Sequence, residues 1–305
     1  NSGVLSRYQK FITPHDLPLI SMGEGNTPLI KAPELEKITK ANVYLKLEGC
    51  NPTGSFKDRG MVVAISGALK SNKKRIICAS TGNTSASASA YGARYGLETL
   101  VIVPESNIAK GKLSQALAYG ARILAIKGNF DDALELVRKT GQELDVEIVN
   151  SINPLRIEGQ KTASFEIIED LGDSPDIVFI PVGNAGNITS YWKGFKEFFN
   201  QGRSTKNPNM MGFQAEGSSP IVRNKVVDFP ETIATAIRIG NPASWKDALE
   251  AKKESDGIID SVTDNEIIEA YLFLARKEGI FCEPASAASV AGLIKLSKNE
   301  FNFSG

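Results

Sequence analysis

Short apolar runs alternate with longer segments of helical periodicity along most of this chain. The apolar runs have the length and β-branched content of strands, and they cover residues 43–47, 75–78, 99–103, 122–126, 147–149, 177–182, 211–215 and 258–262. The segments between them predict helices over residues 55–69, 84–95, 111–119, 131–144, 159–171, 188–199 and 264–278. This alternation predicts an α/β fold with mostly parallel, open, twisted sheets flanked by helices.

Several predicted helices carry end signals. Thr263 followed by Glu266 fits a capping box at the start of the helix 264–278. Gly120, Gly172 and Gly279 stand where the C-caps of three helices are expected. These capping residues support the predicted ends of the helices independently of the hydrophobic pattern.

Composition and charge exclude several classes of protein. The chain has 305 residues, of which 42% are hydrophobic, and its 35 basic residues balance 35 acidic ones. Bulk charge therefore favours neither a nucleic acid nor an acidic membrane as partner. The longest apolar runs have strand length, too short to span a bilayer. We expect one large or two modest domains with a sizeable core and no membrane contact.

Cysteine and histidine are scarce. The three cysteines, Cys50, Cys78 and Cys282, form no CxxC pair, and their odd number favours free thiols in a reducing cytoplasm. His15 is the only histidine, so a HExxH zinc site is excluded and no metal is expected. Acid–base chemistry must then depend on lysine, carboxylates, hydroxyls or a cofactor.

One lysine stands at the turn into a predicted helix, in the sequence Gly54-Ser55-Phe56-Lys57-Asp58-Arg59-Gly60. A lysine amine can form a Schiff base with a carbonyl, including the aldehyde of pyridoxal phosphate, and can later act as a base. The alternative is a solvated helix residue with Asp58 and Arg59 as exposed neighbours. The heptad alone does not decide between the two.

A polar turn follows the strand that ends at Cys78. Its sequence is Ser80-Thr81-Gly82-Asn83-Thr84-Ser85, and helix-forming residues resume directly after it. Free backbone N–H groups and the helix dipole make such a turn an anion site. An ordinary N-cap needs only one such side chain, so six polar or glycine residues favour ligand binding.

A second turn of this kind follows the strand 177–182, with the sequence Gly183-Asn184-Ala185-Gly186-Asn187. It matches neither Walker A nor GxGxxG, which favours a small phosphate compound over a nucleotide. A plain tight turn between strand and helix is the alternative. Further polar residues near strand ends are Lys112, Asn150, Ser151 and Arg156, each of which could also be surface.

Taken together, these motifs resemble the pyridoxal-phosphate enzymes of fold type II, the tryptophan-synthase-β-like fold, and among them the threonine synthase family. The resemblance is carried, in chain order, by residues 23–29, 46–59, 80–85, 150–160, 183–187, 234–242 and 283–289. Residues 55–59 and 80–85 indicate the fold. The turn 183–187 and the stretches NSINPLRIEGQ and ATAIRIGNP are more specific to the threonine synthases.

The resemblance implies roles for single residues. Lys57 would hold pyridoxal 5′-phosphate as a Schiff base and move protons, and Asn83 would bind the ring hydroxyl. Gly183, Asn184, Ala185, Gly186 and Asn187 would cradle the cofactor phosphate. Ser80, Thr81 and Thr84 would meet the substrate, with Thr81 close to the reacting carbons. The substrate phosphate would be bound by Lys112, Asn150, Ser151 and Arg156.

The reaction implied is the conversion of O-phosphohomoserine and water to threonine and phosphate. Two phosphate-binding regions suit a phosphorylated cofactor together with a phosphorylated amino acid. A serine/threonine dehydratase of the same fold is the alternative enzyme. A catalytically silent binding or regulatory relative is the alternative of another class.

The resemblance also implies an organisation. Residues 1–50 and 150–305 would form a larger cofactor-binding domain and residues 51–149 a smaller one, with the cofactor in the cleft between them. A homodimer in the cytoplasm is expected. The closing strand and the TGNGLKDP-like stretch of the family, whose threonine pairs with the pyridine nitrogen, are not found before Gly305.

Overall fold

A computed structural model describes residues 3–105, 110–128, 130–299 and 301–303 of the chain. The backbone divides into two compact units, unit 1 with Asn1–Thr27 and Glu48–Thr162, and unit 2 with Pro28–Leu47 and Ala163–Gly305. The predicted larger domain, residues 1–50 and 150–305, shares residues 28–47 and 163–305 with unit 2, whereas residues 1–27, 48–50 and 150–162 belong to unit 1. Each unit is an α/β assembly with its own parallel sheet.

Contacts within unit 1 explain why its boundaries differ. The N-terminal segment is held by the carboxylate of Glu24, which is buried and accepts a hydrogen bond of 2.9 Å from the Tyr91 hydroxyl. Residues 154–160 form a helix that packs along the helix beginning at Lys57. Both segments are thereby fixed to unit 1, which hydrophobic periodicity does not reveal.

The sheet of unit 1 has four parallel strands in the order β5-β4-β3-β6. Its strands are β3 (Arg75–Ala79), β4 (Glu98–Pro104), β5 (Arg122–Ile126) and β6 (Glu147–Ile148). Their β-branched residues are mostly buried on β3 and β4, the two central strands, as expected for a sheet covered on both faces.

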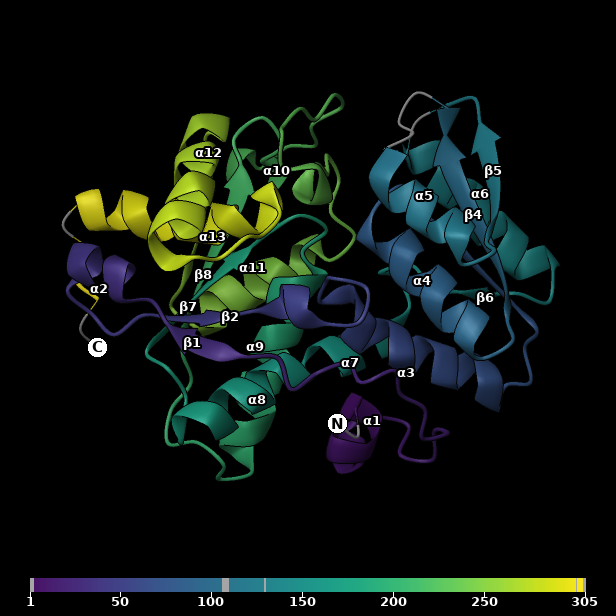
Figure 1. Ribbon diagram of the computed structural model, residues 1–305, viewed down its shortest axis with the longest axis horizontal. Coiled ribbons are helices and arrows are strands. Elements are labelled where there is room, and N and C mark those ends of the chain that lie inside the picture. The colour runs from purple at the N-terminus through teal and green to yellow at the C-terminus, as the bar shows by residue number, and fades with distance from the viewer. Residues whose placement is uncertain (1–2, 106–109, 129, 300, 304–305) are drawn as a thin grey trace. The chain divides into compact units, whose positions relative to one another are not determined.

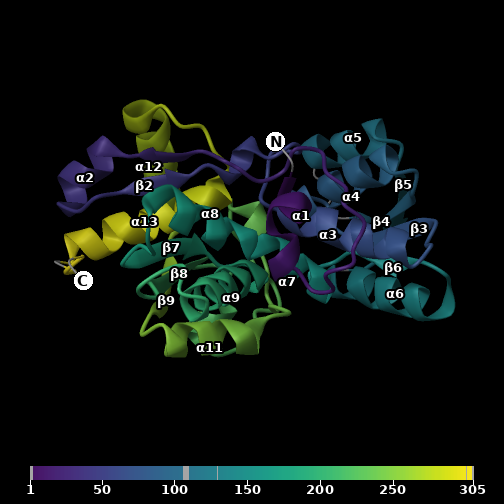
Figure 2. The same cartoon turned by 90° about the horizontal axis from the view of Figure 1, so that it is seen from below.

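Helices cover both faces of this sheet, as Figure 2 shows. On one face, Ala133 and Val137 of α6 (Phe130–Glu143) pack against Ile77 of β3 and Ile102 of β4. On the other lies α4 (Asn83–Arg94), in contact with β3, β4 and α5 (Lys110–Ala118). Because α4 begins where β3 ends, its first residues lie at the carboxyl edge of the sheet, where α/β folds bind ligands.

Helices α3 (Lys57–Lys70) and α7 (Pro154–Gln160) pack unusually closely (Figure 1). A Cβ atom at Gly159 would lie 1.9 Å from the carbonyl oxygen of Arg59, and one at Gly60 would lie 2.7 Å from Nε of Arg156. Only glycine fits at these two positions, so the glycines allow Arg156 to lie against the helix that begins with Lys57.

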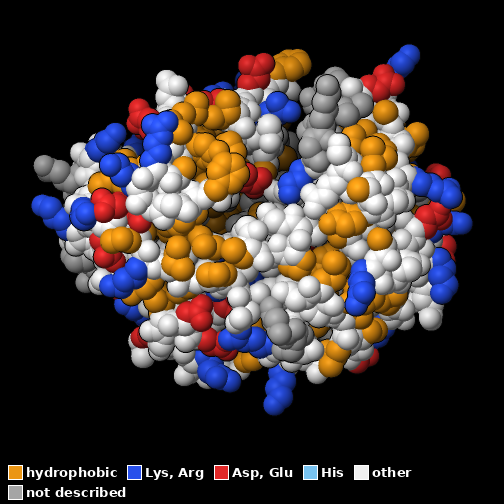
Figure 3. Space-filling view, viewed as in Figure 1, with side chains coloured by type: hydrophobic (Ala, Val, Ile, Leu, Met, Phe, Trp, Pro, Cys, Tyr) orange, Lys and Arg blue, Asp and Glu red, His pale blue; other side chains and the backbone are white. Residues whose placement is uncertain are grey.

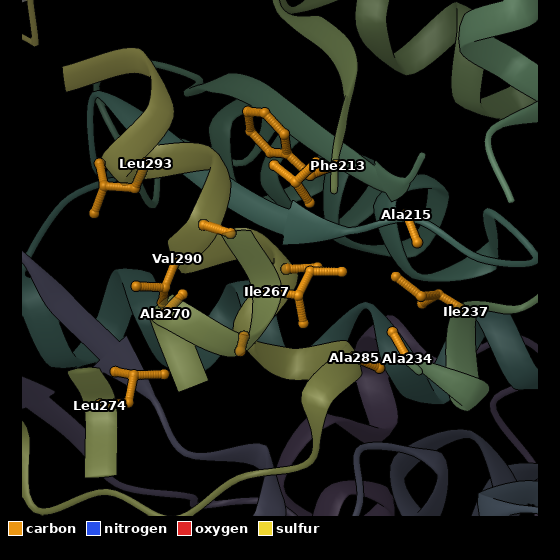
Figure 4. Packing of buried hydrophobic residues seen from close by; sticks show 14 of the residues in the cluster. Phe213, Ala215, Ala234, Ile237, Ile267, Ala270, Leu274, Ala285, Val290 and Leu293 are labelled. Carbon is orange, nitrogen blue, oxygen red and sulfur yellow. The ribbon is translucent and has the colours of Figure 1, made fainter. Parts of the chain in front are cut away.

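The sheet of unit 2 has three parallel strands in the order β7-β8-β9. They are β7 (Ile177–Pro181), β8 (Asn209–Ala215) and β9 (Ile258–Val262). One face packs on α12 (Asp264–Phe273) and α13 (Pro284–Lys298) in a core that includes Phe213 (Figure 4). A Cβ at Gly292 would lie 2.4 Å from the Phe213 ring, so the small residues of α13 let it approach the sheet.

The opposite face of this sheet carries α9 (Gly186–Asn200) and α11 (Trp245–Glu254), as Figure 2 shows. Gly212 of β8 points to this side, because a Cβ there would lie 3.1 Å from Ile188 of α9. The start of α9 therefore stands directly after β7, at the carboxyl edge of the sheet.

One predicted strand belongs to a different kind of sheet. Residues 43–47 contain β2 (Tyr44–Lys46), which pairs antiparallel with β1 (Leu29–Lys31) instead of joining a parallel sheet. The connecting helix α2 (Pro33–Thr39) contacts α13. This pair lies in unit 2.

The remaining predicted strands and helices are confirmed, most within two residues of their predicted ends. The helix predicted over 159–171 begins earlier, as α7 and then α8 (Thr162–Leu171). The helix predicted over 264–278 continues beyond α12 as a π-helix, Leu274–Glu278. The capping box at Thr263 is present, and Gly120, Gly172 and Gly279 have positive φ. Short helices went unpredicted, namely α1 (Gly3–Tyr8), α2, α10 (Pro220–Arg223) and α11.

The last features of the fold concern surface charge, long apolar helices and clusters of metal-binding side chains. Charged side chains of both signs are scattered over the face drawn in Figure 3 and form no single-sign patch there. Among the described residues, no helix is long and apolar enough to cross a membrane. The same residues contain no cluster of three or more His, Cys, Asp or Glu side chains that could hold a metal ion.

Candidate active site

Lys57 is the first residue of α3 and is partly exposed, with its Nζ 4.4 Å from the centre of the Phe56 ring. The two residues that follow it are fully buried. The expectation that Asp58 and Arg59 are exposed neighbours of a solvated lysine is therefore wrong. A lysine followed directly by two buried, hydrogen-bonded residues has a backbone fixed in position, which a reactive amine requires.

The carboxylate of Asp58 is bound by donors from two segments. It accepts hydrogen bonds from the backbone N–H of Thr53 at 2.7 Å, the Thr53 hydroxyl at 2.6 Å and the Ser87 hydroxyl at 2.5 Å. Burial raises the pKa of Asp58, and the hydrogen bonds from Ser87 and Thr53 oppose this. These contacts join α3 to the preceding turn and to α4.

The guanidinium of Arg59 forms a bidentate ion pair with Glu48. Its Nε and Nη2 atoms each lie 2.8 Å from a carboxylate oxygen of Glu48, and Nη1 lies 3.3 Å from the Thr162 hydroxyl. Bidentate pairing fixes orientation as well as distance. The start of α3 is thus set by charged side chains on both sides of Lys57 in the sequence.

The turn 80–85 crosses from β3 to α4. The Ser80 hydroxyl accepts a hydrogen bond of 3.1 Å from the N–H of Gly82, which shapes the turn. Asn83 is buried as the first residue of α4, and Thr81 and Thr84 are partly exposed. The hydroxyls of Thr81 and Thr84 form no hydrogen bond with the part of the chain that the structure describes. They are available to a ligand at the N-terminus of α4.

Asn150 ties this turn to the end of β6. Its Oδ1 accepts from the backbone N–H of Ala79 and its Nδ2 donates to the carbonyl of Ala79, both at 2.9 Å. Asn150 is 5% exposed and Ser151, which follows it, is partly exposed. The amide of Asn150 thus fixes the end of β3 directly before the polar turn. The sequence did not reveal this role.

Arg156 is buried without a carboxylate. It is 1% exposed, and its Nη1 donates to the carbonyl of Val149 at 2.7 Å. Among the described residues no carboxylate pairs with it, and its Nε has no hydrogen-bond partner. Burial lowers its pKa to about 10, so the side chain stays charged at neutral pH. A buried guanidinium of this kind calls for an anion.

Lys112 lies near the start of α5 and donates from Nζ to the carbonyl of Thr53 at 3.2 Å. A Cβ placed on Gly54, whose φ of +83° favours glycine, would lie 3.8 Å from the same Nζ. The ammonium of Lys112 therefore lies beside the turn that precedes Lys57. Thr53 therefore links Lys112 to Asp58, the residue that follows Lys57.

The turn 183–187 of unit 2 is shaped mainly by its backbone. Ala185 has φ +65°, the left-handed conformation, and precedes the first residue of α9. A Cβ at Gly183 would lie 2.8 Å from Cα of Ile237, so only glycine fits there. Successive N–H groups that follow a left-handed residue at a helix start form a concave anion site.

Contacts from a distant loop hold this turn. Asn184 accepts at Oδ1 a hydrogen bond of 2.6 Å from the N–H of Ala243, and its carbonyl accepts one of 3.2 Å from the N–H of Ser244. The side-chain oxygen of Asn187 is buried and accepts no hydrogen bond from a described residue. Ile237, Ala243 and Ser244 thus pack against the turn.

Two of the three cysteines, Cys78 and Cys282, are poor nucleophiles. Burial raises the pKa of the Cys78 thiol to about 12 and that of the Cys282 thiol to about 11, so both are protonated at neutral pH. His15 is exposed on the N-terminal segment. Neither of these thiols nor the histidine is therefore assigned an acid–base role.

Comparisons with known proteins show which family the chain resembles. The model of the family described as pyridoxal-phosphate dependent enzyme matches residues 20–302. The chain is 59% identical to a threonine synthase of Halalkalibacterium halodurans over 294 residues, which cover 96% of this chain and 83% of that protein. It is 56% identical to a threonine synthase of Synechocystis over 296 residues, which cover 96% of this chain and 78% of that protein.

A solved structure shares the fold. Maize serine racemase superposes with a TM-score of 0.79 at 18% sequence identity, covering 90% of this chain and 83% of the racemase chain. At this identity the likeness concerns the fold alone.

Proposed function

The chain belongs to the family of pyridoxal-phosphate-dependent enzymes, and we propose that within this family it is a threonine synthase. Its substrate is O-phosphohomoserine, which reacts with water to give L-threonine and inorganic phosphate. Identity of 59% and 56% to two threonine synthases over 96% of the chain supports the proposal.

The observation that carries the proposal is the buried guanidinium of Arg156. A buried cation without a carboxylate is costly, and an ordinary core would pair it or replace it. A dianionic phosphate group supplies the missing charge, and guanidinium can bind it through two hydrogen bonds. The carboxylate of Asp58 acts on this charge without forming a direct ion pair with it, so a dehydratase acting on unphosphorylated serine or threonine would leave the guanidinium without a bound anion.

The residues of each unit fit the cofactor. In unit 1, the ε-amine of Lys57 is partly exposed at a helix start and can form a Schiff base with the cofactor aldehyde. In unit 2, the N–H groups that follow Ala185 at the start of α9 offer hydrogen-bond donors to a phosphate. We assign the ring hydroxyl to Asn83 and the cofactor phosphate to residues 183–187.

Bound pyridoxal phosphate acts as an electron sink, which makes the proton at Cα of an amino acid removable. The amine of Lys57 then takes the Cα proton and later returns one, because the only histidine, His15, is exposed on the N-terminal segment. Thr81 stands at the turn before α4 with a hydroxyl that is available to the reacting carbons. Ser80 and Thr84 bind the substrate from the same turn.

The substrate phosphate is assigned to Lys112, Ser151 and Arg156, with Asn150 holding Ser151 close to the polar turn. Ammonium and guanidinium together can balance the charge of a phosphate dianion. Fixing this leaving group also orients the carbon chain to which it is bonded.

The proposal is tested by incubating the holoenzyme with O-phosphohomoserine. We expect threonine and phosphate in equal amounts. Formation of a 2-oxo acid and ammonia from serine or threonine, with no threonine from O-phosphohomoserine, would replace the proposal with a dehydratase. Lack of any visible cofactor absorption in the pure protein after addition of pyridoxal phosphate would favour a silent binding relative.

A further inference from the structure

Asp58 is a buried carboxylate that the proposed reaction does not use. It is 0% exposed, and among the described residues no lysine or arginine forms a direct ion pair with it, although its charge acts on buried Arg156. Three hydrogen-bond donors hold it, two from Thr53 and one from Ser87. Because isolated buried charges are costly, an amide or an apolar side chain would serve packing alone at least as well.

The three donors belong to segments that carry site residues. Ser87 lies on α4, one turn after Asn83, so its bond fixes α3 against the helix of the polar turn. Thr53 lies in the turn before Lys57, and Asp58 holds both its N–H and its hydroxyl. A single carboxylate therefore sets the position of the lysine helix relative to two neighbouring segments.

Thr53 passes this constraint on to Lys112. With its N–H and hydroxyl held by Asp58, the peptide of Thr53 has a fixed orientation, and its carbonyl accepts the ammonium of Lys112 at 3.2 Å. Thr53 is 4% exposed, so water does not compete freely for these bonds. The ammonium of Lys112 is thus placed by a carboxylate that it does not touch.

We propose that Asp58 is a positioning residue that acts through Thr53, and that it places the ammonium of Lys112 for the phosphate group of the substrate. The proposal rests on the proposed function for the identity of that phosphate. Thr53 transmits the effect through its hydroxyl and its carbonyl. The carboxylate of Asp58 itself contacts neither substrate nor cofactor.

The experiment compares variants along this chain of contacts in the holoenzyme. Asp58→Asn replaces one acceptor oxygen by a donor, and Thr53→Val removes the hydroxyl at nearly constant volume. Thr53→Ser keeps the hydroxyl and is the matched conservative variant. Thr99→Val removes another buried threonine hydroxyl of unit 1, one that forms no hydrogen bond with a described residue.

Two measurements do not need turnover. One is the binding of inorganic phosphate to the holoenzyme, and the other is the rate at which Lys112 is acetylated, followed by mass spectrometry. For Asp58→Asn we expect phosphate affinity to fall by roughly tenfold and acetylation to accelerate several-fold, since misplacing one group by about 1 Å has effects of this order or larger. Thr53→Val should show smaller changes in the same direction, and Thr53→Ser and Thr99→Val should match the wild type.

The split between KM and kcat separates positioning from general damage. We expect KM for O-phosphohomoserine to rise in Asp58→Asn and Thr53→Val while cofactor absorption and the far-ultraviolet circular dichroism stay unchanged. Wild-type phosphate affinity and Lys112 reactivity in both variants would overturn the proposal. If Asp58→Asn does not fold, the Thr53 pair decides alone. Failure to form threonine would overturn the proposed function and leave the phosphate and labelling results interpretable.

Discussion

The turns at the starts of α3 and α9 are held in position by different kinds of interaction. Both helices begin at a turn to which we assign part of the cofactor. At α3, in unit 1, buried charged side chains fix the turn, with Asp58 held by three donors and Arg59 paired with Glu48. At α9, in unit 2, the backbone fixes it through the left-handed Ala185 and the close approach of Gly183 to Ile237.

The difference follows from what each turn presents. The first presents a side chain, the amine of Lys57, whose position depends on how its helix is held. The second presents backbone N–H groups, whose direction depends on φ and ψ. Mutations should therefore act through charge and packing near α3 and through backbone conformation near α9.

The largest expected effect is that of Lys57→Ala. Removing the amine that binds the cofactor and moves protons should lower kcat by at least about 1,000-fold and abolish the visible absorption of bound cofactor. Lys70→Ala, at the other end of α3 and paired with exposed Asp16, is the matched control and should keep both. Normal absorption in Lys57→Ala would show that another residue holds the cofactor.

Next in size is Gly159→Ala, which tests the packing of α3 on α7. The added Cβ would lie 1.9 Å from the carbonyl oxygen of Arg59, and the backbone cannot yield easily. We expect a loss of about 3 kcal/mol in the free energy of unfolding. Gly49→Ala, where a Cβ meets nothing within 4 Å, should change stability little. Denaturant titration measures both, and equal stability of the two variants would refute this packing.

Arg156→Gln separates function from stability. Loss of a charged hydrogen-bond donor should raise KM for O-phosphohomoserine by roughly 10–100-fold. Removing a buried, unpaired charge should leave the free energy of unfolding unchanged or higher. Arg122→Gln, which changes an exposed arginine of unit 1, is the kinetic control. An unchanged KM in Arg156→Gln would contradict the assignment of the substrate phosphate.

Ala185→Gly tests the backbone side of the comparison. A left-handed conformation costs a residue with a Cβ about 1 kcal/mol relative to glycine, so this variant should be more stable by up to about that amount. Ala251→Gly, within α11, should instead lose about 1 kcal/mol. Thermal unfolding followed by circular dichroism compares the two. Destabilisation by Ala185→Gly would show that the turn is not strained there.

The smallest expected effect is on stability, from the surface ion pair between Lys196 of α9 and Glu254. Glu254 accepts hydrogen bonds from Lys196 and Trp192, which lower its pKa below the usual 4.5. Its stabilising contribution is therefore present above pH 4.5 and lost as pH falls through the lowered pKa. Because the side chain is 38% exposed, Glu254→Gln should cost at most about 0.5 kcal/mol at pH 7 and nothing near pH 2. Denaturant titration of the wild type and Glu254→Gln at pH 7 and pH 2 measures this difference in the free energy of unfolding.

Most of the fold could be predicted from hydrophobic periodicity. Strands 75–78, 122–126 and 258–262 stand out because they are short apolar runs between polar turns. The antiparallel pairing of β1 and β2 was missed because a three-residue strand carries little periodicity. Helix α11, with the sequence WKDALEAKKE, was missed because most of its residues are polar and few face the core.

The site was predicted in part for the same physical reason. Lys57 and the two polar turns stand out because they break the pattern of apolar and helical segments. Thr53, Ser87 and Glu48 were missed, since contacts between distant segments decide their roles. The amide of Asn150, which clips the end of β3, was likewise invisible in the sequence.

The central claim, that the chain is a threonine synthase, is tested most directly by running the reaction in ¹⁸O-labelled water and analysing both products by mass spectrometry. If phosphate leaves with its bridging oxygen and water then adds to the carbon chain, the label enters the hydroxyl of threonine and the phosphate stays unlabelled. Label in the phosphate, with homoserine as the second product, would show hydrolysis of the phosphate ester and contradict the claim.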